Sequence, residues 1–317
     1  MNKGLPINIY LMRYMLFLFL IVLPSAFLFG QHFFIRESDS ADHFVLKSID
    51  NEKVTRYIGS YDILRGQPVK FMTNWSLSKD GKFYWVNGEN IYEFDFDSQK
   101  SRLISSHWHF ILEFFVIDSF AYIVYNPLTN EGPHDNRYSP GLKFCYLNLK
   151  NGQRNYFQIP GTYNFTNLSI SPNRTWAAFI NTIPTDNDNV KKYQFVLFNQ
   201  RTRSLRIIDS AVSSKYEWFG DDDKYNSSIW ADSSTLLYYK HTNGRDYGSV
   251  LSYSTLTKEA KVKLKSIAER DFTWFGFYQN AFYFSDRKGI YRIENSNDKR
   301  VIVRNSNVLQ ACIFPRD

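Results

Sequence analysis

Two histidines of this chain have the spacing of a metal-ligand pair. His107 and His109 flank Trp108, and side chains two positions apart point to the same side of an extended segment. If Ser106 to Phe110 forms a strand, both imidazoles can therefore reach one divalent cation such as Zn²⁺. Alternatively, the pair packs among aromatic residues in a strand that connects two sheets.

Two groups of acidic residues offer the oxygen ligands that Ca²⁺ prefers. One is Asp221–Asp223, and the other holds Asp186 and Asp188. Neither group has the glycine and the terminal glutamate of an EF-hand loop, so solvated loops are the alternative. We therefore expect no cofactor, and Ca²⁺ or another divalent metal is the exception to test.

Sequence motifs for several other chemistries are missing. The chain has no glycine-rich phosphate loop and no Gly-x-Ser-x-Gly nucleophile motif. No pair of carboxylates can be assigned to acid–base catalysis from spacing alone. These absences argue against a P-loop nucleotide-binding protein and against a serine hydrolase.

The stretch from Asn74 to Ser105 predicts the kind of element that positions these residues. Turn residues at Asp80-Gly81 and Asn87-Gly88-Glu89 separate short runs of aromatic and branched residues, a pattern typical of antiparallel strands joined by tight turns. The stretch therefore predicts four strands. Aromatic residues make up 18% of the chain, which favours an all-β protein because flat rings pack well on a pleated surface.

Weaker copies of this four-stranded unit follow along the chain. Their first turns lie at Asp118, Asn173, Asp232 and Asn280, about 40 to 60 residues apart, which is the period of propeller blades or slightly above it. Such units bury both of their faces only by stacking around an axis. The sequence therefore predicts a six-bladed β-propeller of four-stranded antiparallel blades over residues 31–317.

The two ends of the chain together predict one of these blades. Residues 32–58 show only three strands, and residues 307–317 show only one. We expect the C-terminal strand to pair with the N-terminal strands, because closure of the ring removes exposed sheet edges. The alternative is a longer protein that was cut after the start of a seventh blade.

Residues 1–30 predict a signal peptide or a signal anchor. Lys3 and Arg13 precede an apolar run at residues 14–29, whose length lies between a signal-peptide core and the roughly 20 residues that span a bilayer. One hydrophobic helix is expected here, cleaved after Gly30 or retained in the membrane. Positive charges before such a run stay in the cytoplasm, so the remaining chain is expected to be extracellular or periplasmic.

The cysteines and the glycosylation sequons are compatible with export without establishing it. Cys145 and Cys312 either form one disulfide or remain buried thiols. Five sequons are candidate glycosylation sites, and they begin at Asn74, Asn164, Asn167, Asn173 and Asn226.

The net charge of +7 permits anionic partners. Lys and Arg are scattered, however, and the densest run, Arg201–Arg206, falls in a turn and the following strand. A solvated strand edge explains this run, because charge protects an edge from aggregation. Nucleic acid is not expected as a partner of an exported chain.

Three tryptophans are candidate ligand contacts. Trp75, Trp230 and Trp274 lie on the expected innermost strands of the second, fifth and sixth units. Their rings could line a mouth that holds a sugar or a peptide. Alternatively, they fill the wedges between neighbouring blades.

The first turns of three units carry a short shared pattern: Ser78-Lys79-Asp80-Gly81-Lys82-Phe83, Ser171-Pro172-Asn173-Arg174-Thr175-Trp176 and Ala231-Asp232-Ser233-Ser234-Thr235-Leu236. This pattern is similar to the Ser-Pro-Asp-Gly turn of TolB-like propellers and of the amino-terminal propellers of dipeptidyl-peptidase-type serine peptidases. The resemblance implies a propeller fold over nearly all of the exported chain. The peptidase resemblance would also imply a hydrolase domain, for which this sequence has no nucleophile motif.

These observations predict an exported or membrane-anchored propeller that acts as a non-enzymatic binding module for a protein or a glycan. Membrane contact is expected through residues 14–29 if they are not cleaved. One alternative is a propeller enzyme, similar to a lactonase or a lyase, with a polar or metal site in the central channel. Another is a degenerate or truncated propeller of a dipeptidyl-peptidase-like serine peptidase that lacks the hydrolase domain.

Overall fold

The computed structural model describes most of the chain after residue 31. The expected signal peptide or anchor lies outside the described residues. Among those that are described, no helix is long and apolar enough to cross a membrane. The described ranges are 32–40, 43–50, 53–59, 74–78, 82–86, 89–95, 98, 100–108, 110–126, 143–159, 164–183, 185–187, 190–215, 219, 228–241, 247–268, 274–278, 280–286, 289–295, 298–304 and 308–314.

The described residues form strands and one short 3₁₀ helix, Ser213–Lys215. The strands are β1 (His32–Ser40), β2 (His43–Asp50), β3 (Lys53–Gly59), β4 (Asn74–Leu77), β5 (Phe83–Val86), β6 (Ile91–Asp95), β7 (Lys100–Ser105), β8 (Phe110–Ile117), β9 (Phe120–Asn126), β10 (Lys143–Asn148), β11 (Arg154–Gln158), β12 (Asn164–Ile170), β13 (Trp176–Ile183), β14 (Lys192–Asn199), β15 (Leu205–Val212), β16 (Ser228–Trp230), β17 (Thr235–His241), β18 (Tyr247–Ser254), β19 (Ala260–Ala268), β20 (Trp274–Tyr278), β21 (Ala281–Asp286), β22 (Gly289–Asn295), β23 (Asp298–Arg304) and β24 (Val308–Phe314).

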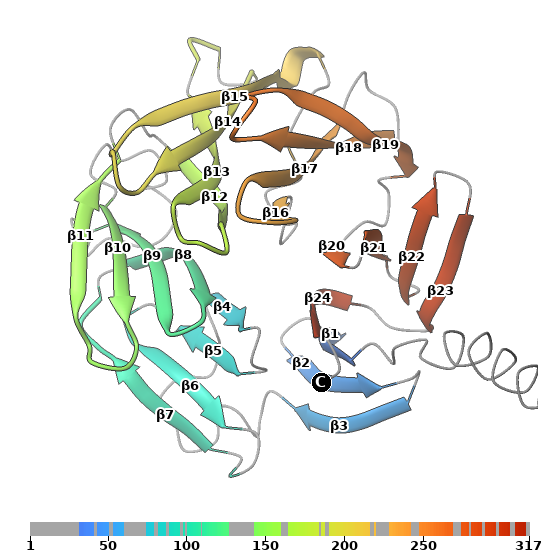
Figure 1. Ribbon diagram of the computed structural model, residues 1–317. Coiled ribbons are helices and arrows are strands. Elements are labelled where there is room, and N and C mark those ends of the chain that lie inside the picture. The colour runs from blue at the N-terminus through green and yellow to red at the C-terminus, as the bar shows by residue number, and fades with distance from the viewer. Residues whose placement is uncertain are drawn as a thin grey trace, which may run out of the picture.

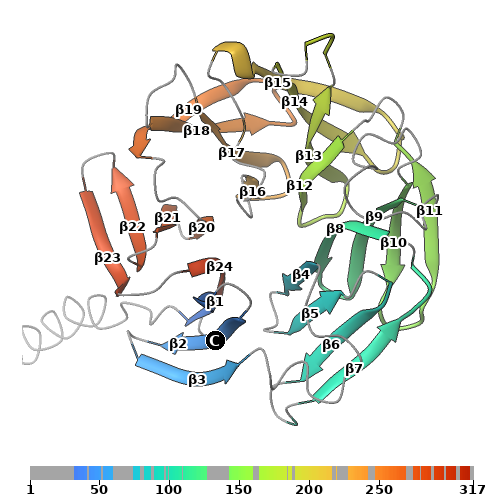
Figure 2. The same ribbon diagram turned by 180° about the vertical axis from the view of Figure 1, so that it is seen from behind.

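These strands pair into four-stranded antiparallel sheets that stand around a central axis, which confirms the β-propeller (Figure 1). Five sheets consist of strands consecutive in the chain, and we number them as blades 2 to 6: β4–β7, β8–β11, β12–β15, β16–β19 and β20–β23. The sixth sheet has the order β24-β1-β2-β3 and is blade 1. The first strand of each blade lies nearest the axis, and the fourth lies at the rim (Figures 1 and 2).

Blade 1 is built from both ends of the described chain. Strand β24 runs antiparallel to β1, with His32 opposite Phe314 and Arg36 opposite Gln310. Strand β24 thus occupies the innermost position that β4 or β8 holds in its own blade (Figure 2). Through this pairing, β1 has a neighbour on both of its edges.

The hydrophobic core lies between neighbouring blades. Along β9, Tyr122 and Val124 pack toward blade 4, whereas Ala121 and Ile123 pack toward blade 2. Successive side chains of a strand point to opposite faces, and both faces of blade 3 are therefore buried. This explains the continuous apolar run in β9, because a strand covered on both sides has no polar face to show.

Small polar side chains join the innermost strands of successive blades. The hydroxyl of Ser76 on β4 accepts a hydrogen bond from the backbone N–H of Val116 on β8, at 3.0 Å. Farther along the ring, the hydroxyls of Ser169 on β12 and Ser228 on β16 lie 2.9 Å apart. All three serines are buried, so each bond satisfies polar groups that water does not reach.

An ion pair joins blades 4 and 5 farther from the axis. Lys240 Nζ lies 2.7 Å from Asp209 Oδ1, and the Tyr238 hydroxyl donates to Asp209 Oδ2 at 3.0 Å. The ammonium of Lys240 also lies 5.3 Å from the ring centre of Phe219. Both charged side chains are largely buried, at 15% and 18% exposure, so removal of either one would leave the other unpaired.

The turn between the third and fourth strands repeats in blades 3, 4 and 5. It begins at Asn148, Asn199 and Ser254, each of which accepts a backbone bond from the residue four positions later. That fourth residue has a positive φ in all three turns: 72° at Gly152, 59° at Arg203 and 63° at Lys258. Only the first of these positions carries the glycine that this backbone conformation favours.

We expect Arg203→Gly to stabilise the protein by about 0.5 to 1 kcal/mol, because glycine adopts the left-handed conformation without a Cβ penalty. Urea unfolding of the wild type and the variant measures this change. Thr202→Gly is the matched control in the same turn. Thr202 does not have a positive φ, so glycine at this position only adds freedom to the unfolded chain and should destabilise the protein. Stabilisation by both substitutions would contradict the argument.

Candidate functional site

Two pockets occupy equivalent positions at consecutive blade junctions. Each lies where the second and third strands of one blade meet the turns of the next blade. These turns, between the first and second strands and between the third and fourth, define what we call the turn face of the ring. The blade 2–3 pocket has a volume of about 710 Å³, and the blade 3–4 pocket has about 340 Å³.

The backbone pairing establishes that the two pockets are equivalent. Tyr84 lies opposite Glu93 in blade 2, as Tyr122 lies opposite Tyr146 in blade 3. On the facing blade, the N–H of Leu149 donates to Ser119 O, and that of Gln200 donates to Thr175 O, both at 2.9 Å. The residue before the acceptor, Asp118 or Arg174, has a positive φ in each case. The two pockets are therefore copies built on one backbone frame.

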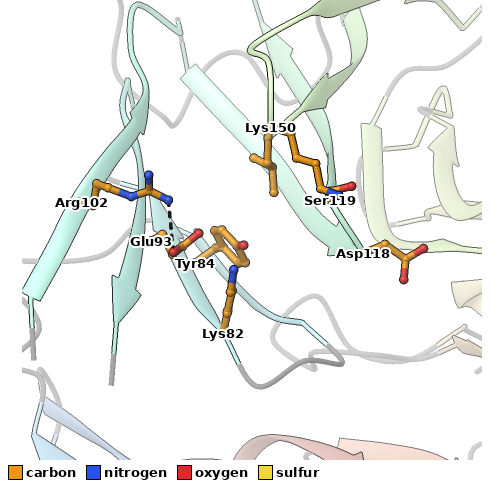
Figure 3. A pocket seen from close by; sticks show the side chains of 8 residues that line it. Lys82, Tyr84, Glu93, Arg102, Asp118, Ser119 and Lys150 are labelled. Carbon is orange, nitrogen blue, oxygen red and sulfur yellow. Dashed lines mark hydrogen bonds and ion pairs between the residues drawn. The ribbon is translucent and has the colours of Figure 1, made fainter. Parts of the chain in front are cut away.

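The blade 2–3 pocket contains charges of both signs (Figure 3). Glu93 and Arg102 form an ion pair at 3.3 Å on the blade 2 side, beside Lys82 and Tyr84 (Figure 3). Asp118, Ser119 and Lys150 come from blade 3. The remaining lining residue is Leu149.

The blade 3–4 pocket contains aromatic rings and two arginines. Its walls are Phe120, Tyr122, Tyr146, Asn173, Arg174, Gln200 and Arg201. The guanidinium carbon of Arg174 lies 4.2 Å from the ring centre of Phe120, close enough for a cation–π contact. Burial raises the pKa of Tyr122 well above its ordinary value, although the charge of Arg174 opposes this shift. The phenol of Tyr122 is therefore neutral at physiological pH.

A carboxyl group on an inner strand joins blade 3 to blade 4. Glu113 lies on β8 at a register shift, and its Oε1 accepts the backbone N–H of Asn167 on β12 at 3.2 Å. Burial raises the pKa of Glu113 from 4.5 to about 8, although the backbone amides of Asn167 and Leu168 oppose the shift. Asn167 itself has a φ of 58°, which places its N–H at an irregular point of β12.

The metal-ligand pair His107 and His109 was predicted on the condition that residues 106–110 form an extended strand, and the described residues do not meet that condition. Residues 106–108 are not a strand, and His107 has a φ of 61°. The expectation of an extended segment is wrong at this point, because the buried indole of Trp108 donates to Ser105 Oγ and its backbone N–H donates to Glu89 O. The side chain of His107 is exposed. His109 lies outside the described residues, so its role as a ligand stays a prediction.

Of the three candidate tryptophans, the structure describes the side chain of Trp230 alone. Trp230 is only 8% exposed and packs between blades 4 and 5 with Tyr238 and Phe219. Its position therefore matches the packing alternative rather than a binding mouth. The side chains of Trp75 and Trp274 lie outside the described residues.

The predicted calcium sites are described only in part. Asp186 is an exposed loop residue, whereas Asp188 and Asp221–Asp223 lie outside the described residues. Within the described part of the chain, no three His, Cys, Asp or Glu side chains are grouped to hold a metal ion.

Two of the five sequon asparagines have described side chains. Asn173 is exposed at a turn, where its Oδ1 accepts the backbone N–H of Thr175. Asn167 is half-buried on β12. The side chains of Asn74, Asn164 and Asn226 lie outside the described residues, and glycosylation at all five stays a prediction.

Cys145 is a buried free thiol, so it forms no disulfide. It packs between blades 2 and 3, and burial raises its pKa to about 12. A thiol held in its protonated form is a poor nucleophile. Cys145 therefore belongs to the core, and the side chain of Cys312 lies outside the described residues.

Sequence reasoning missed both the pockets and Glu113. The pockets depend on which side chains meet across a blade junction, and no local motif specifies that meeting. The sequence did contain a signal for the backbone frame that the two pockets share. The turns that begin at Asn148, Asn199 and Ser254 have the same length and a polar first residue. Aligning those turns would have placed Lys150 and Arg201 at equivalent positions.

No protein-family model and no curated protein matches the sequence. The fold does match solved structures. A chain of the nidogen/laminin complex aligns with a TM-score of 0.55 and 11% identity, over 90% of this chain and 98% of that chain. Oligogalacturonate lyase from Vibrio parahaemolyticus aligns at 0.55 and 10% identity, over 86% and 79%.

TolB from Acinetobacter baumannii aligns with a TM-score of 0.53 and 10% identity, over 93% of this chain and 70% of that chain. At such identities these likenesses show the fold alone. They confirm that the chain has a fold-level resemblance to TolB-like β-propellers.

We expect Glu113→Gln to remove a pH dependence of stability. Between pH 4.5 and about 8 the folded protein retains a proton on Glu113 that the unfolded chain has released. The free energy of unfolding therefore falls as the pH rises, by at most about 1.4 kcal/mol per pH unit. Relative to the variant, the wild type should lose stability between pH 5 and pH 8 and change little above that range.

Urea unfolding at pH 5, 6, 7 and 8 tests this expectation. Glu259→Gln is the control, because the Glu259 side chain is 61% exposed and should leave the pH profile unchanged. Parallel profiles for the wild type and Glu113→Gln would contradict the assigned role of Glu113.

Proposed function

We propose that this protein is an exported, non-enzymatic binding module whose ligand docks on the turn face of the propeller. The observation that supports this most strongly is the repetition of one pocket frame at two consecutive blade junctions. Both pockets present cationic groups beside a tyrosine ring. A ligand that spans both junctions gains from two sites held at a fixed separation.

The ligand class that fits this surface is an anionic protein or glycan. Lys150 and Arg201 stand at equivalent positions of the two pockets, and both are exposed. The chain as a whole has a net charge of +7, which attracts acidic partners over several ångströms. Export is proposed from residues 1–30, whose basic residues and apolar run predict a signal peptide or an anchor.

A pair of charge-reversal variants of the full chain tests this proposal. Lys150→Glu combined with Arg201→Glu changes both pockets, whereas Lys192→Glu changes an exposed residue at the opposite end of the blades. Binding to arrayed glycans and to surface proteins of the source cells is measured at two salt concentrations. We expect the double variant to bind at least tenfold more weakly and Lys192→Glu to bind like the wild type.

Two results would contradict the proposal. An equal loss of binding in Lys192→Glu would assign the docking surface elsewhere. Turnover of esters, lactones or peptides by the purified chain would overturn its non-enzymatic character.

One observation favours a second candidate function, that of a propeller enzyme with a polar site near the axis. Glu113 lies on an innermost strand, and its pKa of about 8 allows it to exchange a proton near neutral pH. This second function predicts that Glu113→Gln abolishes turnover of a substrate found by screening and that Glu259→Gln does not. Turnover that survives Glu113→Gln excludes this carboxyl as the acid or base.

A further inference from the structure

We propose that the blade 3–4 pocket binds the carboxylate of an acidic sugar. This inference rests on the proposed function and names the ligand of one of its two pockets. Four features of the pocket support it: its charge, the position of Arg174, the polar groups of its wall, and its size.

The carboxylates that line the blade 2–3 pocket have no counterpart in the described walls of the blade 3–4 pocket. Where the blade 2–3 pocket has Glu93, the blade 3–4 pocket has Tyr146, and where the former has Asp118, the latter has Arg174. Both acidic groups of the frame are thus replaced, and no carboxylate lines the blade 3–4 pocket among the described residues. The charged side chains among the described lining residues are Arg174 and Arg201. They favour an anionic ligand, although the carboxylate of Asp118 also acts on Tyr122.

Arg174 is held in place by its turn and by an aromatic ring. Its backbone N–H donates to Ser171 O at 2.7 Å, and Asn173 Oδ1 accepts from Ser171 Oγ and from the N–H of Thr175. The guanidinium carbon of Arg174 lies 4.2 Å from the ring centre of Phe120. A fixed guanidinium presents two parallel donors, the geometry that matches a carboxylate.

The walls supply neutral polar groups beside this cation. The hydroxyl of Tyr122 stays protonated, so it can donate a hydrogen bond. Gln200 lines the same pocket, where its side chain interacts with the Tyr122 hydroxyl and its buried Nε2 atom lacks a hydrogen bond of good geometry. An unsatisfied buried donor is unfavourable, and an acceptor that enters the pocket can satisfy it after rotation of the amide.

The shape and composition of the pocket favour a sugar over a peptide. Its volume of about 340 Å³ lies at the lower end for small-ligand sites, which suits one sugar ring. Phe120, Tyr122 and Tyr146 offer ring faces and edges to the C–H groups of a sugar, and Asn173 offers an amide to its hydroxyls. The lining residues come from turns and from β9 and β10, which have a neighbouring strand on both edges, so these strands offer no open edge for a peptide to extend.

Ligand-observed NMR titration of the full chain tests the inference. The probes are D-galacturonate and D-glucuronate, with neutral D-galactose and D-glucose, inorganic phosphate and an N-acetylglutamate amide as comparisons. We expect the two uronates to bind at least tenfold more tightly than every comparison. Arg174→Glu should weaken uronate binding at least tenfold.

Arg203→Glu is the matched control, because Arg203 also has a positive φ of 59°, is exposed, and lies on the turn face of the same blade. It makes the same change of charge outside the pocket and should leave uronate affinity within twofold of the wild type. Tyr146→Glu is a second variant that restores the acid of the blade 2–3 pocket, and it should abolish binding. Thermal unfolding confirms that each variant is folded.

Each other outcome overturns the inference. Equal affinity for neutral sugars would exclude carboxylate recognition, equal affinity for phosphate would indicate a general anion site, and tighter binding of the glutamate amide would assign the pocket to peptides. An equal loss of uronate affinity in Arg174→Glu and Arg203→Glu would show that binding depends on the overall charge of the protein and not on this pocket. If no probe binds while a glycan or protein partner still docks on the turn face, this inference fails and the proposed function stands.

Discussion

The geometry of the ring depends on the hydrogen bonds between its innermost strands. The first strand of a blade pairs with the second on one edge only, so its other edge presents backbone groups with no strand beside them. Ser76 and Glu113 each accept a backbone N–H from the next inner strand, and Ser169 bonds to Ser228. Among the described residues, these bonds join blades 2, 3, 4 and 5 through their innermost strands.

Farther from the axis the blades lie farther apart, and larger side chains fill the space between them. Small residues such as Ala177 and Ala178 lie on β13, whereas aromatic rings occupy the facing positions, including Tyr122 in one junction and Tyr238 in the next. Toward the turn face this packing gives way to polar groups. The pockets form at that margin, because the turns are fixed by their own hydrogen bonds and do not collapse onto the neighbouring blade.

Much of the fold could be predicted from sequence, because turns and strand alternation are local. The Asp-Gly and Asn-Gly turns around β5 and the apolar runs of β9 and β13 identified four-stranded units, and the single strand at residues 308–314 was recognised as one that lacked its neighbours. The segment around His107 was predicted wrongly, because the burial of Trp108 imposes a left-handed residue where alternation suggested a strand. Alternation cannot anticipate this, because the backbone N–H of Trp108 is bonded to Glu89 O, nineteen positions earlier, and its indole is bonded to Ser105 Oγ.

The candidate site was less accessible to sequence reasoning, since its residues come from different blades. Arg174 and Phe120 are more than fifty positions apart in the chain, and their contact depends on the packing of blade 3 against blade 4. The buried position of Trp230 likewise follows from that packing between neighbours. Comparison between blades is more informative than any single motif, because the repeat supplies its own reference for what is unusual at one junction.

The pairing of β24 with β1 has a mechanical consequence. His32 lies opposite Phe314, so the chain enters blade 1 and leaves it at the same end of one antiparallel ladder. A force that pulls these two points apart opens the ladder one hydrogen bond at a time, as a zipper opens, and does not shear all of its bonds together. Tension applied at His32 and Phe314 therefore loads the hydrogen bonds of this ladder in sequence, whereas tension across two neighbouring blades loads a whole packed interface at once.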